Sequence, residues 1–395
     1  MLNINNINET IRRIRDVLLY ILMFVTAISY HPTIVLMSKA AGYDSGTILS
    51  RYIVLLFGAV FILSISLNAF RRSKLIRNYL VWMIIITIVG FSILAFFQNS
   101  NMVRELRSFV IVLGAIIIGY DLRLNHGQFS FFVLSFSITI LFSGVMQVFQ
   151  NIGGFQIADQ YLADAKNSLG AMLATSSFAM IYLRRVRSNK LLRLVLLICI
   201  LLSVVVIVTI RARMAFLSLV LVVLLYWFLI TRNRNILITL ILAGFGVLLL
   251  ALFMPSAVLD YFEASFTSGT QEEDFTSGRL VTYLEAILYL GQHPFLGDVQ
   301  QLNSIAWIHN YPLLNLYNYG MLFSWPILAL YVYLLVLAIR FSRKNSHMSI
   351  ACFGGTCLLI PFLISMAEPT FPFGPGTVTI FNFILLGMAE KETTN

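Results

Sequence analysis

Long apolar runs recur along the chain and restrict its possible folds more than any other feature. Each has roughly 17–22 residues, enough for a helix to cross a bilayer core of about 30 Å. Hydrophobic residues make up 59% of the 395, charged residues 11%, and the mean hydropathy is +0.87. A soluble domain carries about 25% charged residues, and β-barrel strands alternate in segments of about ten residues. The sequence therefore predicts an all-α, polytopic integral membrane protein and excludes soluble, disordered and β-barrel classes.

About twelve transmembrane helices are expected within one membrane domain over residues 1–395, since no repeat or Gly/Ser-rich linker divides the chain. The first apolar run is longer than a signal-peptide core and lacks a cleavage site, so it is interpreted as an uncleaved span. A long loop over 255–317 separates the last three spans from the others. The predicted spans are 17–37, 52–70, 78–97, 107–121, 129–150, 167–183, 191–210, 213–231, 235–254, 318–339, 349–367 and 375–389.

Basic residues divide unequally between the two sides of these spans. With the N-terminus in the cytoplasm, 19 of the 27 Lys and Arg residues fall inside, and 12 of the 17 acidic residues fall outside. This is the bias of the positive-inside rule. Both termini are therefore expected in the cytoplasm, and the 255–317 loop in the periplasm. The net charge of +10 is explained by topology and anionic lipid, so no nucleic-acid partner is expected.

Arg211 and Arg213 stand between two apolar spans, on the side where basic residues are disfavoured. Either they fill a tight hairpin that needed polar residues, or a guanidinium faces a phosphate. Arginine donates to phosphate in a bidentate manner and keeps its charge. Residues i and i+2 of a helix point about 200° apart, so both can serve one ligand only if the turn is unwound.

The long loop contains an amphipathic helix near 278–291, expected to lie on the membrane surface or roof a cavity. Thr276 or Ser277 can cap its start, while Gly291 and Pro294 end it. Arg279 stands in the first turn, where the helix dipole disfavours a cation. An anionic partner is therefore expected, either Glu272, Glu273 or Asp274, or a ligand phosphate. The apolar positions at helical spacing are Leu280, Tyr283, Leu284, Ile287 and Leu288.

His309 and Asn310 begin the next apolar helical run. The histidine is either a satisfied polar residue at an interface or a general base, since neutral imidazole suits that role near neutral pH. No second histidine lies at ligand spacing and no CxxC pair is present, so no metal site is expected. No phosphate-binding loop or Rossmann glycine pattern occurs, so no cofactor is expected either.

These pieces, in this order, resemble the O-antigen ligase and polymerase superfamily of bacterial surface-polysaccharide assembly. The likeness covers about residues 160–330: an arginine after a mid-chain span (Arg213), then SGR before an amphipathic helix and HPFLG (Arg279, Pro294, Gly297), then HN with a later glycine (His309, Asn310, Gly320). The resemblance implies that the two arginines hold the pyrophosphate of an undecaprenyl-linked glycan and that the histidine activates the acceptor hydroxyl. This chain departs from the family pattern at Ala212, where a Ser or Thr often precedes the first arginine, and by the additional Arg211.

The resemblance implies a glycosyltransferase of the inner membrane that polymerises lipid-linked repeat units. AKNSLGAMLA, with Lys166 and Asn167, is similar to the polymerases; the ligase, the alternative, often carries an acid after its HN pair, where this chain has Tyr-Pro-Leu-Leu. A lipid-linked oligosaccharide flippase or transporter is a further alternative. Such proteins keep ionisable residues near the bilayer midplane, whereas the interiors of the predicted spans contain almost none. The expected partners are the glycan donor and acceptor, the bilayer, a chain-length regulator and a flippase.

Overall fold

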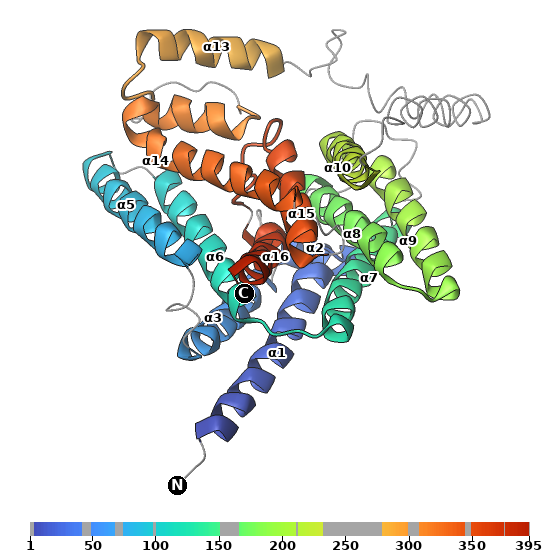
Figure 1. The fold of residues 1–395 in the computed structure, drawn as a ribbon. Coiled ribbons are helices and arrows are strands. Elements are labelled where there is room, and N and C mark those ends of the chain that lie inside the picture. Colours follow the sequence, from blue (N-terminus) through green and yellow to red (C-terminus); the bar gives the residue numbers. More distant parts are fainter. Residues whose placement is uncertain are drawn as a thin grey trace, which may run out of the picture.

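The computed structural model describes residues 4–41, 49–67, 74–97, 100–150, 166–210, 212–231, 279–298, 308–343, 349–374 and 376–394. Every regular element within these ranges is a helix (Figure 1). The all-α class is therefore confirmed for this part of the chain. The helices are α1 (Ile4–Ile28), α2 (Pro32–Ala40), α3 (Leu49–Ser66), α5 (Lys74–Phe97), α6 (Ser100–Asp121), α7 (His126–Gln150), α8 (Lys166–Val186), α9 (Lys190–Thr209), α10 (Arg213–Thr231), α13 (Arg279–Gln292), α14 (Tyr311–Ser342), α15 (Ile350–Ile364) and α16 (Gly376–Thr394).

Several of these helices could cross a membrane. By length and composition, α3, α7, α9 and α14 qualify, and the bent pair α1 and α2 would add a fifth candidate. Three shorter apolar helices span Arg77–Gly90, Arg213–Phe228 and Ile350–Ile364. The described residues thus support a helical membrane protein with four or five candidate spans, not the expected number of about twelve.

Part of this difference has a physical reason. Helices do occupy most of the predicted span positions, although 235–254 lies outside the described residues. Some are short: α15 has 15 residues, fewer than the about 20 needed to cross a bilayer. Others carry several charges toward one end: Arg104, Glu105 and Arg107 in α6, and Glu390, Lys391 and Glu392 in α16.

The first predicted span, 17–37, is not one continuous helix. Helix α1 ends at Ile28, α2 begins at Pro32, and the two are bent by 78°. Proline lacks a backbone N–H and disfavours helical geometry at the preceding residue, here His31. The backbone N–H of His31 donates to the Ile28 carbonyl, closing a turn in place of the helix.

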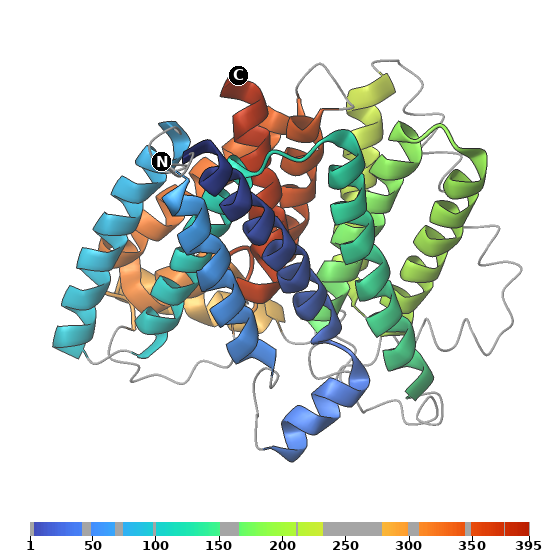
Figure 2. The same ribbon diagram turned by 90° about the horizontal axis from the view of Figure 1, so that it is seen from below.

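The helices stand side by side as a bundle, with the start of α1 and the end of α16 at the same end (Figure 2). Helices α6 and α16 cross closely, and Gly119 and Gly387 each lie against the backbone of the other helix. Helix α16 also packs on α15, which contacts α14, α10 and α8. Helix α15 therefore lies among the elements that position the candidate site.

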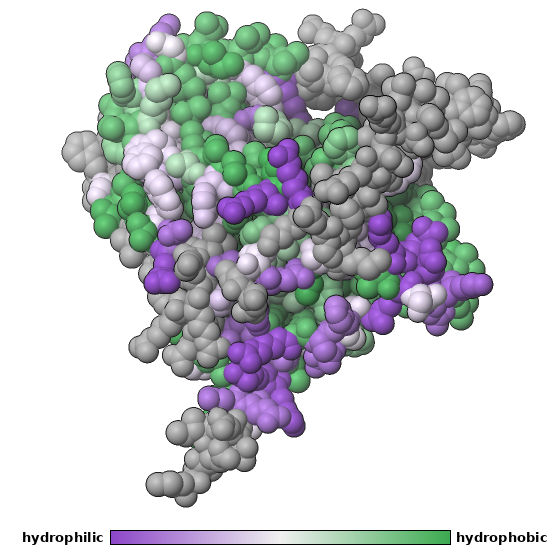
Figure 3. All heavy atoms as spheres, viewed as in Figure 1, coloured by the Kyte–Doolittle hydropathy of each residue, from purple (hydrophilic) through white to green (hydrophobic). Residues whose placement is uncertain are grey.

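Buried polar contacts join α1, α6 and α16 at that end of the bundle. The Arg15 side chain is 1% exposed and donates to the Asp121 carboxylate, whose side chain is 4% exposed. Lys391 donates to the carbonyl of Leu122, the residue after α6. In the space-filling view, hydrophilic residues gather along the amino-terminal part of α1 and at the corner between α8 and α9 (Figure 3).

Candidate functional site

The turn after α15, Ser365–Glu368, is where three separate segments meet. Its carbonyl oxygens accept three consecutive hydrogen bonds: from the Tyr311 N–H at Ser365, from the Asn310 side-chain amide at Met366, and from the Arg279 guanidinium at Ala367. The donor–acceptor distances are 2.9, 3.1 and 3.1 Å. The turn thus fixes the starts of α13 and α14 relative to the end of α15.

Arg279 is the first residue of α13, and its side chain is 31% exposed. Its Nη1 donates to the Ala367 carbonyl, and its Nη2 lies 3.7 Å from Oε1 of Glu368. A cation is favoured at the carboxyl end of a helix, so the end of α15 offsets the unfavourable position of Arg279 on its own helix. The described anionic partner is therefore Glu368, which neither sequence alternative named. Glu272, Glu273 and Asp274 lie outside the described residues.

His309 and Asn310 lie directly before α14. Asn310 caps this helix, because its side-chain oxygen accepts from the Leu313 N–H at 2.9 Å. The His309 carbonyl accepts from the Tyr283 hydroxyl of α13 at 2.7 Å, and the Nδ1 of its imidazole is buried. The structure therefore brings Arg279, His309 and Asn310 into one connected group.

Helix α13 packs against α14 through one face only (Figure 1). Ala286 is buried in a small cluster with Ile308 and Tyr317, and Tyr283 and Tyr289 pack beside it. The opposite face is exposed and apolar: Leu280, Leu284, Ile287 and Leu288 are 55–69% exposed. An exposed apolar face of this kind suits a helix in a membrane interface.

The HPFLG segment after α13 (residues 293–297) packs against α14 at the position where the helical geometry of α14 is interrupted. Gly297 and Gly320 have φ values of +58° and +60°, and Gly320 interrupts the helical geometry. The Asp298 N–H donates to the Tyr317 carbonyl at 2.7 Å, and the Met321 N–H donates to the Pro294 carbonyl at 2.8 Å. The two glycines that carry the family resemblance therefore meet in one backbone-to-backbone contact.

Arg213 and the start of α8 lie on elements next to this group. Arg213 is the first residue of α10, is half-buried, and belongs to a helix that packs on α8 and α15. Gly170 in the first turns of α8 lies against Ala212, so α8 and α10 begin side by side. Lys166 and Asn167 are the first two residues of α8, and Asn167 is half-buried. Arg211 and the side chain of Lys166 lie outside what the structure describes.

Glu368 is the site residue that sequence reasoning missed. A signal for it exists, since Glu368 is the only carboxylate between Asp298 and Glu390 and stands between two apolar runs. The residue is 8% exposed. A single acid on the side expected to face outward is therefore a candidate site residue, as are the arginines on that side.

Comparison of the chain with protein-family models and with curated proteins finds no match. Within the described ranges, no group of three His, Cys, Asp or Glu side chains is arranged to hold a metal ion. The site is therefore characterised by its own geometry: the Arg279 guanidinium, the Asn310 amide and the Glu368 carboxylate lie at one turn, and His309 directly precedes Asn310.

Replacing Tyr283 by phenylalanine removes the hydrogen bond to the His309 carbonyl. The free energy of unfolding is expected to fall by about 0.5–1.5 kcal/mol, the net value of one hydrogen bond. Burial raises the pKa of Tyr283 above its ordinary value of 10.0, Arg279 lowers it, and Glu368 raises it further. The hydroxyl therefore stays a donor throughout the neutral range, and its contribution is lost only as the pH rises through the raised pKa. Thermal unfolding from pH 6 to 11 would test this. A wild-type advantage over the variant that fades below pH 9 would contradict it.

Proposed function

We propose that this protein is a membrane glycosyltransferase that polymerises undecaprenyl-pyrophosphate-linked repeat units into O-antigen or a related surface polysaccharide. The observation that carries the proposal is the connected group in which Arg279 and Asn310 donate to the Ser365–Glu368 turn and the His309 carbonyl accepts from Tyr283 of α13. Arg213, on a helix that packs against α15, supplies a second cation in this proposal. The fold contributes apolar helices compatible with a membrane substrate.

The chemistry requires a cation for the leaving group and a base for the nucleophile. A hydroxyl of the acceptor glycan attacks the anomeric carbon of the donor, and the bond from this carbon to the pyrophosphate oxygen breaks. The hydroxyl proton passes to His309, whose Nε2 we assign this role because Nδ1 is buried. Arg279 and Arg213 stabilise the charge that develops on the departing lipid pyrophosphate.

Glu368 has a defined role in this scheme. Its 3.7 Å separation from Nη2 of Arg279 exceeds a hydrogen-bond distance, so the carboxylate orients the guanidinium without occupying its donors. A phosphate oxygen can then accept from the same guanidinium while the Ala367 carbonyl holds Nη1. Glu368 is thus a positioning residue.

The ligase is the alternative function within the same superfamily, and both would use the same donor. The Tyr-Pro-Leu-Leu segment after Asn310 favours the polymerase, because it lacks the acid that the ligase often carries there. Surface polysaccharide from a deletion strain separates the two. Single repeat units on the lipid A core would support the polymerase, and accumulation of full-length lipid-linked chains would support the ligase. Loss of a flippase would instead leave the donor on the cytoplasmic side.

The proposed site should face the periplasm, with both termini in the cytoplasm. Alkaline phosphatase is active only after export, so fusions after residue 270 are expected to be active and fusions at residue 188 inactive. The 19-to-8 asymmetry of basic residues predicts this result. The start of α1 and the end of α16 at one end of the bundle also favour it (Figure 2). The reverse activity pattern would remove the proposed site from the periplasm.

A further inference from the structure

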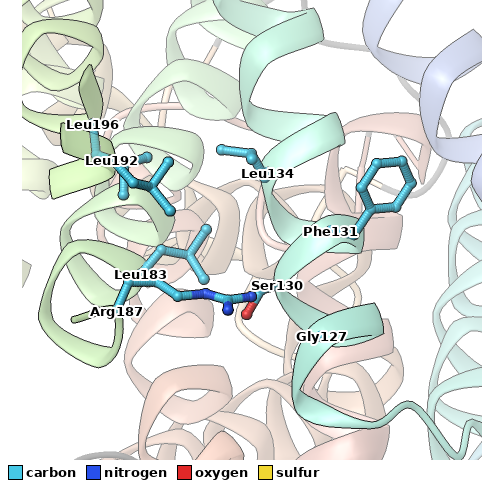
Figure 4. A pocket seen from close by; sticks show the side chains of 8 residues that line it. All are labelled: Gly127, Ser130, Phe131, Leu134, Leu183, Arg187, Leu192 and Leu196. Atoms are coloured by element: carbon cyan, nitrogen blue, oxygen red, sulfur yellow. The ribbon is translucent and has the colours of Figure 1, made fainter. Parts of the chain in front are cut away.

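A hollow of about 270 Å³ lies between α7 and the corner formed by α8 and α9 (Figure 4). Its walls are leucine and phenylalanine side chains, with one hydroxyl and one guanidinium at the edge. Arg187 extends across the hollow toward Ser130 of α7 (Figure 4). The lining residues are Gly127, Ser130, Phe131, Leu134, Leu183, Arg187, Leu192 and Leu196.

The three helices that line this hollow carry charges of one sign only, and Glu392 of α16 interacts electrostatically with Tyr182 of α8 nearby. The α8–α9 corner carries five basic residues, and α7, α8 and α9 contain no aspartate or glutamate. The Nε of Arg184 is buried and has no hydrogen-bond partner among the described residues. The basic residues of the corner are Arg184, Arg185, Arg187, Lys190 and Arg193. None of these three helices therefore offers the corner a carboxylate, and an external anion would complement it.

The surroundings indicate that this anion carries an apolar chain. Leu183 and Leu196 are buried walls of the hollow, and the outward face of α9 beside it is apolar. On that face Leu194, Ile198 and Leu201 are 54–58% exposed, as expected of a surface in contact with lipid. A soluble anion would leave the leucine walls in contact with water, whereas an acyl chain covers them.

We propose that this hollow binds an anionic phospholipid, with the phosphate at Arg187 and an acyl chain along Leu134, Leu183 and Leu196. The site is separate from the candidate catalytic group. It lies at the opposite end of α8 from Lys166, and the 21 residues of α8 span about 30 Å. Its occupancy does not depend on which reaction the protein catalyses.

The test measures lipid binding to the purified full chain in detergent, by native mass spectrometry, with phosphatidylglycerol and phosphatidylcholine as probes. The wild type is expected to retain phosphatidylglycerol in preference to phosphatidylcholine. Arg187→Gln is expected to weaken phosphatidylglycerol binding about fivefold or more, because one basic contact is lost. The control, Arg193→Gln, removes an exposed charge of the same corner that does not line the hollow, and it should bind nearly as the wild type does.

Leu134→Trp provides a second test that keeps every charge. A larger side chain in the hollow should reduce phosphatidylglycerol binding if an acyl chain occupies this space. Equal losses in Arg187→Gln and Arg193→Gln would overturn the proposal in favour of a diffuse electrostatic effect. Displacement of the lipid by inorganic phosphate at the same concentration would indicate a soluble-anion site and would also overturn it. An unchanged melting temperature in each variant shows that a loss of binding is not a loss of folding.

Discussion

Replacing Arg279 by lysine is expected to lower the rate of glycan transfer by about 10²–10³-fold, the usual cost of removing one transition-state donor. Lysine keeps the positive charge but cannot donate to the Ala367 carbonyl and to a phosphate in one fixed plane. In the structure Nη1 is committed to Ala367, so a second, rigidly oriented nitrogen is needed for the ligand. The measurement is transfer by purified protein from a lipid-pyrophosphate-linked donor.

Gln292→Ala is the matched control, because Gln292 is exposed at the other end of α13. It should keep wild-type activity. His309→Ala should lose turnover while donor binding is largely preserved, since a base acts on the acceptor hydroxyl and not on the pyrophosphate. Wild-type polysaccharide length in both Arg279→Lys and His309→Ala strains would refute the site. Arg211→Ala is expected to be tolerated if Arg213 contacts the phosphate.

Gly320→Ala is expected to destabilise the contact between the HPFLG segment and α14 by at least about 1–3 kcal/mol. Its φ of +60° and ψ of −178° fall in a region that is almost restricted to glycine. A Cβ at this position would also clash with the carbonyl of Phe295. The strain and the clash act together, so thermal unfolding in detergent should begin at a clearly lower temperature. Activity should fall too, because the same segment follows the helix that carries Arg279.

Gly291→Ala tests whether the effect is specific to this break. Gly291 lies within α13, and a Cβ there would meet no atom within 4 Å. Alanine is preferred over glycine in a helix by about 0.5–1 kcal/mol, so this variant should be as stable as the wild type or more so. A Gly320→Ala protein that melts with the wild type would show that the break at Gly320 is not required.

Local patterns in the sequence were sufficient to place most helices. Apolar runs and 3–4 spacing depend only on neighbouring residues. Helices α7 and α9 lie where the apolar runs at 129–150 and 191–210 predict them. The capping side chain of Asn310 and the helix-breaking effect of Pro32 are also local. Such features follow from rules that need no knowledge of the rest of the chain.

The contacts of the site could not be predicted in this way. Arg279 and Ala367 are 88 residues apart in the chain, so no local pattern relates them. The sequence predicts that Arg279 pairs with a nearby upstream acid or with a ligand phosphate, whereas the described partner, Glu368, comes from a turn beyond two further helices. The break at Gly320 is similarly non-local, because the φ value of that glycine is required by the Phe295 backbone lying against it.

The buried pair of Arg15 and Asp121 has a consequence for the order in which the chain can enter the bilayer. The two residues are 106 positions apart, so the ribosome delivers the guanidinium well before its carboxylate. Nε and Nη2 of Arg15 already donate to the neighbouring Asp16 at 3.0 and 2.6 Å, so before α6 emerges only Nη1 lacks its carboxylate. Burying an incompletely paired charge is costly, and Arg15 lies about 20 Å along α1 from Ile28. Until α6 emerges, α1 is therefore expected to rest with Arg15 in the headgroup layer, and to reach its final depth only when Asp121 arrives.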